Sequence, residues 1–221
     1  MLSHTARPLL RGLYIILDPG AIGPRSLGEV LDHAVAGGAR LFQYRDKAAS
    51  GREAYRRAME LRRITADAGA LFLVNDRCDL ALAVDADGVH LGQNDLPVSR
   101  ARAILGPDKI IGLSTHTPHQ VSEATRQEVD YLGFGPIFPT GTKPDHEPLV
   151  GLEGLAEIRR LTSLPIFGIG GVTVESTEAV IRAGANGVAV VSAIWRSPDI
   201  RGTVQAFIAC VQQGVRPDRE P

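Results

Sequence analysis

The feature that most constrains the fold of this chain is a repeated alternation of short apolar runs with longer stretches of helical character. Runs such as Ile15-Ile16-Leu17 have the near-continuous apolar character of strands that are buried on both faces. Strands that alternate with helices indicate β–α–β units and a parallel sheet. The eight predicted strands span residues 13–18, 40–45, 71–75, 88–91, 110–114, 131–135, 166–170 and 187–192.

Helical stretches separate these strands and set the expected fold class. They span residues 26–36, 51–68, 80–84, 99–105, 118–126, 152–161, 174–183 and 200–211. Eight such units in 221 residues predict an α/β fold, a single closed (β/α)8 TIM barrel, with an open doubly wound sheet as the alternative. We expect residues 1–12 to be an N-terminal extension, residues 13–213 to be the catalytic barrel domain, and residues 214–221 to be a disordered tail.

The charge balance excludes some partners. The 24 Lys and Arg residues face 25 Asp and Glu residues, so the net charge is −1 and no basic field for nucleic acid is expected. No apolar run reaches the roughly 18 residues that a membrane span needs, and the first residues lack a signal-peptide pattern. We therefore expect a cytoplasmic protein without a membrane partner. The sequence leaves open whether it forms a homo-oligomer.

Polar residues follow the second predicted strand, where the loops of a TIM barrel build its active site. Gln43, Arg45 and Lys47 alternate along the chain and share one side of it. Two cations and an amide at a barrel mouth suit a phosphate or a diphosphate. The alternative is a solvated charged loop in which the cations pair with Asp46.

Two carboxylates follow the third and fourth predicted strands, which are neighbours in a barrel. Asp76 comes after Asn75, and Asp95 lies in Gln93-Asn94-Asp95. Two carboxylates beside phosphate-binding cations suit Mg²⁺, which takes few protein ligands and keeps waters and substrate oxygens. The alternatives are that Asp76 caps the next helix and that Asp95 starts a turn.

Ser114 and His116 follow the fifth predicted strand. Ser114 is placed to hydrogen-bond a polar ring, and no Gly-x-Ser-x-Gly pattern surrounds it, which argues against a serine hydrolase. His116 is a candidate base, although a structural role is the commoner one for a lone loop histidine.

The long Gly- and Pro-rich loop after the sixth predicted strand ends in a group that resembles an anion clamp. Its members are Thr140, Thr142 and Lys143. Long loops with their own set of side chains are often functional lids, and an irregular surface loop is the alternative.

The loops after the seventh and eighth predicted strands, which carry Gly171, Val191 and Ser192, complete the rim. In TIM barrels these loops commonly bind phosphate, and a glycine lets backbone N–H groups approach it. No Gly-x-Gly-x-x-Gly follows the first strand, and no P-loop occurs. The simplest interpretation is that two phosphorylated small molecules meet over the barrel mouth.

Several stretches together resemble the thiamine phosphate synthase family. They are Gln43-Tyr44-Arg45-Asp46-Lys47 and residues 75–83, 87–96, 112–116, 135–143, 169–171 and 187–194. Their order and spacing match over about residues 13–196, which is more specific than any single motif. The resemblance implies a (β/α)8 barrel that joins a pyrimidine diphosphate to a thiazole phosphate, with release of diphosphate.

The resemblance also implies a role for each site residue. Those that would hold the pyrimidine diphosphate are Gln43, Arg45, Lys47, Asn75, Ser114 and Lys143, of which Arg45, Lys47, Ser114 and Lys143 would be catalytic. Asp76 and Asp95 would hold Mg²⁺. Those that would hold the thiazole phosphate are Thr140, Gly141, Thr142, Gly171, Val191 and Ser192.

Three positions bear on alternatives within this family. A related thiazole tautomerase carries a histidine where this chain has Pro136, and it lacks the full carboxylate pair, so the sequence favours the synthase. Tyr44 stands where an aliphatic residue is usual, and Gly141 loosens the expected clamp. A non-catalytic barrel that only binds phosphorylated ligands is the alternative from another class.

Overall fold

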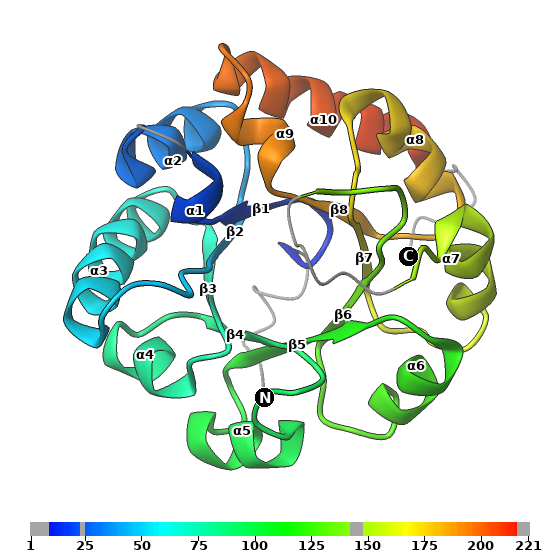
Figure 1. Cartoon of the computed structure of the whole chain (residues 1–221), viewed down its shortest axis with the longest axis horizontal. Helices are drawn as coiled ribbons and strands as arrows, with labels where there is room; N and C mark the ends of the chain where they lie inside the picture. Colours follow the sequence, from blue (N-terminus) through cyan, green and yellow to red (C-terminus); the bar gives the residue numbers. More distant parts are fainter. Residues whose placement is uncertain (1–8, 23–24, 142–147, 216–221) are drawn as a thin grey trace.

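The fold is a closed ring of parallel strands surrounded by helices, as the computed structural model shows for residues 9–22, 25–141 and 148–215 (Figure 1). The strands are β1 (Gly12–Leu17), β2 (Leu41–Tyr44), β3 (Leu71–Asn75), β4 (Gly88–Leu91), β5 (Ile110–Thr115), β6 (Tyr131–Phe134), β7 (Ile166–Ile169) and β8 (Gly187–Val190). Each pairs with its neighbours in chain order, and β8 closes the ring on β1 with Leu13 opposite Val188. The predicted (β/α)8 barrel is confirmed, and the open sheet is excluded.

The helices form an outer layer around the strands (Figure 1). They are α1 (Pro19–Ile22), α2 (Leu27–Ala36), α3 (Gly51–Asp67), α4 (Cys78–Ala83), α5 (Val98–Leu105), α6 (Pro118–Ala124), α7 (Gly151–Arg159), α8 (Val174–Arg182), α9 (Ser192–Trp195) and α10 (Ile200–Gly214). The sequence did not predict α1 and α9, because helices of four residues carry no apolar period. Ser192, expected in the last strand, begins α9.

Side-chain capping fixes where several helices begin. The side chains of Ser26 before α2 and Ser50 before α3 each accept a hydrogen bond from the backbone amide three residues later. Thr117 accepts one from the Gln120 amide at the start of α6, where Pro118 is the first residue of the helix. Such caps satisfy amides that have no partner within the helix, and each contributes roughly 1 kcal/mol.

The apolar core has two parts. The larger lies between the strands and the helices, and strand residues such as Ile15 and Phe42 belong to it. The smaller fills the barrel interior, where Tyr14, Tyr131 and Phe167 pack edge to face. These large side chains are almost fully buried, and burial of each stabilises the fold by about 1.5–3 kcal/mol.

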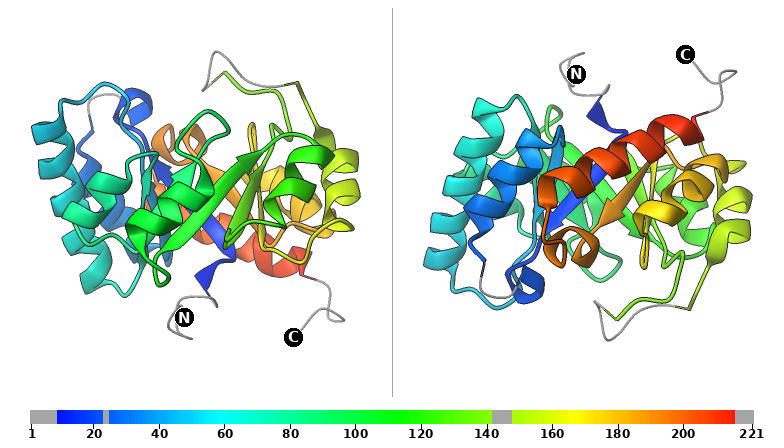
Figure 2. Two further views of the ribbon diagram at one scale, coloured as in Figure 1. Left: turned by 90° about the horizontal axis from the view of Figure 1, so that it is seen from below. Right: turned by 90° about the horizontal axis from the view of Figure 1, so that it is seen from above.

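The two ends of the barrel are occupied differently. The start of β1 and the end of α10 lie at one end, and the described part of the loop between β6 and α7 lies at the other (Figure 2). All eight strands run parallel, so their carboxyl ends gather at this second end. Among the described helices, none is long and apolar enough to cross a membrane.

Candidate active site

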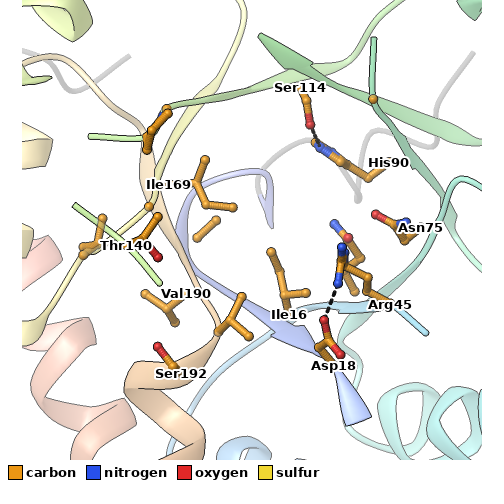
Figure 3. Close-up of a pocket in the computed structure, with 18 of the residues that line it drawn as sticks. Ile16, Asp18, Arg45, Asn75, His90, Ser114, Thr140, Ile169, Val190 and Ser192 are labelled. Atoms are coloured by element: carbon orange, nitrogen blue, oxygen red, sulfur yellow. Dashed lines mark hydrogen bonds and ion pairs between the residues drawn. The ribbon is translucent and has the colours of Figure 1, made fainter. Parts of the chain in front are cut away.

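A cavity of about 270 Å³ opens at the carboxyl ends of the strands (Figure 3). The expected site residues that line it are Gln43, Arg45, Lys47, Asn75, Asp76, Asp95, Ser114, Thr140, Gly171, Val191 and Ser192. Gly141 is exposed and is not among the lining residues. Thr142 and Lys143 lie outside the described residues. The fold thus brings most of the expected set around one space.

The two described cations pair with carboxylates of the cavity wall. Arg45 forms an ion pair with Asp18, which follows β1, and Figure 3 shows the two side chains pointing toward one another. Lys47 pairs with Asp76. Neither pairs with Asp46, so the interpretation of residues 43–47 as a self-paired charged loop is wrong.

Asp46 instead holds the loop between β2 and α3 in place. Its carboxylate is almost fully buried and accepts hydrogen bonds from the amides of Ala48 (3.1 Å) and Ala49 (2.9 Å). The Tyr44 hydroxyl (3.0 Å) and Arg57 (2.8 Å) donate to its other oxygen. The unusual tyrosine therefore contributes a hydroxyl that fastens the loop carrying Lys47.

Asp76 stands at the end of β3 in a strained backbone conformation. Its φ is 61°, in the left-handed region, where a non-glycine residue is uncommon and often marks a functional site. The residue at the start of α4 is Arg77, which makes no side-chain cap, so the expectation that Asp76 caps this helix is excluded.

Asp76 and Asp95 lie close together at the rim. Burial and the hydrogen bond with Asp95 raise the pKa of Asp76 above its usual value, although Lys47 opposes the shift. Asp95 accepts a hydrogen bond from the Gly92 amide (2.7 Å), so it closes the turn that precedes it, whereas the sequence alternative had Asp95 starting a turn. Two adjacent carboxylates that face an open cavity are a donor set suited to Mg²⁺. Among the described residues there is no group of three or more metal-ligating side chains, so the cation's other ligands would be water and substrate oxygens.

Ser114 is tied to the barrel interior through His90. The His90 Nε2 lies 2.9 Å from the Ser114 hydroxyl, as Figure 3 shows, and its Nδ1 lies 2.8 Å from the Tyr131 hydroxyl. Burial lowers the pKa of His90 to about 4, so its ring is neutral at pH 7.

The opposite wall is built by two loops that pack against one another. The amides of Ile137 and Phe138 donate to the carbonyls of Ile169 (2.8 Å) and Gly170 (3.0 Å). Gly171 has a φ of 63°, and a Cβ there would lie 2.4 Å from the carbonyl oxygen of Pro139. Glycine is therefore required both by the backbone conformation and by the neighbouring loop.

His116 lies at the cavity with its Nδ1 2.6 Å from the carbonyl oxygen of Gly135. A carbonyl oxygen only accepts, so Nδ1 donates this hydrogen bond. This contact ties the loop after β5 to the loop after β6.

The sequence reasoning missed two residues of the site, Asp18 and His90. Asp18 ends the first predicted strand, and the rule that drew attention to the other strand ends applies to it equally. His90 lies within the otherwise apolar strand β4, so it was counted as part of the strand and not as a site residue. A polar residue inside an apolar strand was the feature that could have indicated it.

Comparison with known proteins identifies the family. The family model for thiamine monophosphate synthase matches residues 13–194, which is most of the chain. The chain belongs to the thiamine monophosphate synthase family. This confirms the resemblance and the expected class of enzyme, a transferase of thiamine biosynthesis.

Individual members of the thiamine monophosphate synthase family align over nearly their whole length. The thiamine-phosphate synthase of Chloroflexus aurantiacus is 47% identical over 90% of this chain and 92% of its own. That of Azorhizobium caulinodans is 47% identical over 95% of this chain and 99% of its own. The structure of a thiamine phosphate pyrophosphorylase from Pyrococcus furiosus superposes with a TM-score of 0.85 at 37% identity, covering 96% of this chain and all of the other.

Proposed function

We propose that the chain joins two phosphorylated heterocycles to make thiamine phosphate. The substrates are 4-amino-2-methyl-5-(diphosphooxymethyl)pyrimidine and a 4-methyl-5-(2-phosphoethyl)thiazole, or the carboxythiazole form of the latter. The reaction is a Mg²⁺-assisted dissociative substitution in which diphosphate leaves and the thiazole nitrogen attacks the pyrimidine methylene carbon. The observation that carries this proposal is the convergence of Asp76, Asp95, Arg45 and Lys47 on one side of a single cavity.

The pyrimidine diphosphate belongs on the side built by β2 to β5. Arg45 and Lys47 bind its phosphate oxygens, with Lys143 from the loop after β6 as a further cation that the resemblance implies. Gln43, Asn75 and Ser114 orient the ring. Positioning a leaving group among fixed charges is an effective form of catalysis, because the charges need no reorganisation during the reaction.

Asp76 and Asp95 would hold Mg²⁺, which supplies charge neutralisation for the departing diphosphate. Magnesium dependence is a property of the family, and the carboxylate pair fits it. Lys47 pairs with Asp76 and partly compensates its charge. Because the diphosphate leaves dissociatively, breaking its bond to the pyrimidine methylene carbon needs no nucleophile from the enzyme.

The thiazole phosphate belongs on the opposite wall. Gly171, Val191 and Ser192 line the cavity there with Thr140, and Gly141 and Thr142 complete the set that the resemblance implies. The wall is otherwise apolar, which suits a thiazole ring beside the hydrophobic Ile169. In this proposal the two substrates face one another across the cavity.

The tautomerase alternative finds no support at Pro136. That residue packs against Gly170, where a Cβ would approach the Pro136 Cβ to 2.6 Å, and it brings no imidazole to the cavity. A barrel that only binds phosphorylated ligands is distinguished by the product assay.

The test is a product assay with the purified protein, both substrates, and either Mg²⁺ or excess EDTA. We expect thiamine phosphate with Mg²⁺ and none with EDTA. Asp76→Ala and Lys143→Ala should mainly lower kcat. The control is Asp79→Asn, which replaces an exposed carboxylate that pairs with Arg77 and is not among the lining residues of the cavity, and it should leave the rate unchanged. No product from folded protein under either condition would reject the proposed reaction, and full activity of both site variants would reject the assigned roles.

A further inference from the structure

An uninterrupted chain of hydrogen bonds crosses the interior of the barrel. Gln43 Nε2 donates to the Tyr14 hydroxyl (2.5 Å), and that hydroxyl lies 2.8 Å from the Tyr131 hydroxyl. Tyr131 lies 2.8 Å from His90 Nδ1, and His90 Nε2 lies 2.9 Å from the Ser114 hydroxyl. Both ends of this relay, Gln43 and Ser114, line the cavity, and its two phenols are buried below the cavity floor.

The barrel is built to admit this relay. Gly112 stands where a Cβ would lie 2.1 Å from the Tyr131 ring, and at Gly133 a Cβ would lie 3.2 Å from His90. Tyr14 and Tyr131 also pack edge to face with Phe167. The ring positions are thus fixed by packing, which leaves little freedom for the hydroxyl groups to choose other partners.

The relay has a direction. Each of its three inner members has one proton to donate: two phenols, whose pKa values burial raises, and an imidazole that is neutral because burial lowers its pKa. An amide nitrogen can only donate, so the Tyr14 hydroxyl oxygen accepts a hydrogen bond from Gln43, and the Tyr14 hydroxyl group donates a hydrogen bond to the Tyr131 oxygen. Tyr131 then donates to His90 Nδ1, and His90 Nε2 donates to Ser114.

The direction fixes what the two ends offer to a ligand. The Gln43 amide nitrogen donates to Tyr14, so the Gln43 side-chain carbonyl oxygen remains as an acceptor for a ligand. Ser114 accepts from His90 and keeps its hydroxyl proton as a donor. Each inner member has a single proton, so reversing one end alone would leave a buried phenol proton without an acceptor, and the two ends are therefore coupled.

We propose that this relay selects an aminopyrimidine over an oxopyrimidine, by presenting Gln43 as an acceptor and Ser114 as a donor to the substrate ring. An amino group donates to the Gln43 carbonyl, and an unprotonated ring nitrogen accepts from Ser114. An oxopyrimidine carries a carbonyl acceptor and a ring N–H donor instead, so both contacts are mismatched. Tyr14, Tyr131 and His90 are positioning residues. The inference rests on the proposed function, since it concerns the ring of the same diphosphate.

The test compares the 4-amino substrate with its 4-oxo analogue as pyrimidine diphosphates. Two quantities are measured for each: kcat/KM with saturating thiazole phosphate, and the Kd without thiazole phosphate. We expect the wild type to prefer the amino form by about 100-fold or more, because an unmatched buried polar group costs about 1–3 kcal/mol and two contacts change. Tyr131→Phe deletes one hydroxyl of the relay and should lower this preference at least about tenfold.

Two further variants control for effects of packing. Tyr14→Phe breaks the relay next to Gln43 and should have the same effect on the ratio, so it decides the matter if Tyr131→Phe does not fold. Tyr44→Phe removes another buried tyrosine hydroxyl, one that donates to Asp46 and lies outside the relay, and should leave the ratio unchanged. A merely structural role would lower both substrates' rates and leave their ratio intact.

The outcomes separate this inference from the proposed function. A wild type that makes product without a preference for the amino form overturns the selection and keeps the reaction. A relay variant that folds and keeps the wild-type ratio also overturns the selection. A wild type that binds the amino form preferentially and makes no product overturns the reaction and keeps the selection.

Discussion

Replacing Asp46 by asparagine tests whether a buried carboxylate fastens the loop that carries Lys47. In Asp46→Asn the oxygen that accepts from Ala48 and Ala49 is kept. The oxygen that accepts from the Tyr44 hydroxyl and from Arg57 becomes an amide nitrogen, which can only donate. The substitution therefore removes one side of the network with almost no change in shape.

The magnitude follows from what each partner loses. The Tyr44 side chain is 1% exposed, so its hydroxyl proton is left without an acceptor in the interior, at about 1–3 kcal/mol. Arg57 is 32% exposed and keeps Glu53 at 2.8 Å, so its loss is small. We expect Asp46→Asn to lower the free energy of unfolding by about 2 kcal/mol, and Tyr44→Phe alone by about 1 kcal/mol.

Urea denaturation of the two single variants and the double variant measures this. The double variant has no orphaned hydroxyl, so its loss should be smaller than the sum of the single losses by about 1 kcal/mol. Additive losses, or a loss below about 0.5 kcal/mol for Asp46→Asn, would refute the reasoning.

The same carboxylate sets a pH dependence. Burial raises the pKa of Asp46, but the hydrogen bonds from Ala49, Tyr44, Ala48 and Arg57 outweigh it and hold the pKa below its usual value. A carboxyl with a lowered pKa contributes stability that is present above about pH 4 and is lost as the pH falls through the folded-state pKa. Wild-type stability should therefore fall more steeply below pH 4 than that of Asp46→Asn.

The cavity yields two further predictions. Asp18→Asn removes the ion-pair partner of Arg45, so kcat/KM for the pyrimidine diphosphate should fall about tenfold. Stability should change by less than about 1 kcal/mol, since the pair is part-buried at an open cavity wall where solvent weakens it. Steady-state kinetics and thermal unfolding check this, and unchanged kinetics would count against a role for Asp18. Gly171→Ala forces a Cβ against the Pro139 carbonyl at a positive φ, so stability should fall by about 1–3 kcal/mol and the KM for the thiazole phosphate should rise. Gly51→Ala, at the exposed start of α3 where a Cβ meets nothing, is the control that should lose no stability.

The sequence predicted the barrel because most strand residues are buried and the strands form nearly continuous apolar runs. It missed α1 and α9 because a four-residue helix has no period to detect. The rule that polar residues at strand ends form the active site correctly predicted that Asp76, Asp95 and Ser114 line one cavity. It did not reveal the ion pairs, because Arg45 pairs with Asp18, 27 positions away, and only the pairing of β1 with β2 brings these two strand ends together.

The hydrogen-bonded relay in the barrel interior could not be predicted from the sequence, for a related reason. Tyr14 and Tyr131 are 117 positions apart, and each sits in an apolar run where a tyrosine reads as one more large hydrophobic residue. A hydroxyl inside such a run implies a buried partner, but the identity of that partner depends on which strands face one another across the barrel.

The close approach of Gly112 to Tyr131 also constrains how this barrel can change over evolutionary time. A methyl group at position 112 would occupy the space of the tyrosine ring, so alanine is acceptable there only in a background that has already lost the ring. The two positions, one on β5 and one on β6, are therefore epistatic, and the order of substitution matters. Libraries that vary position 112 alone will find it intolerant, whereas substitution of positions 112 and 131 together opens new sequences.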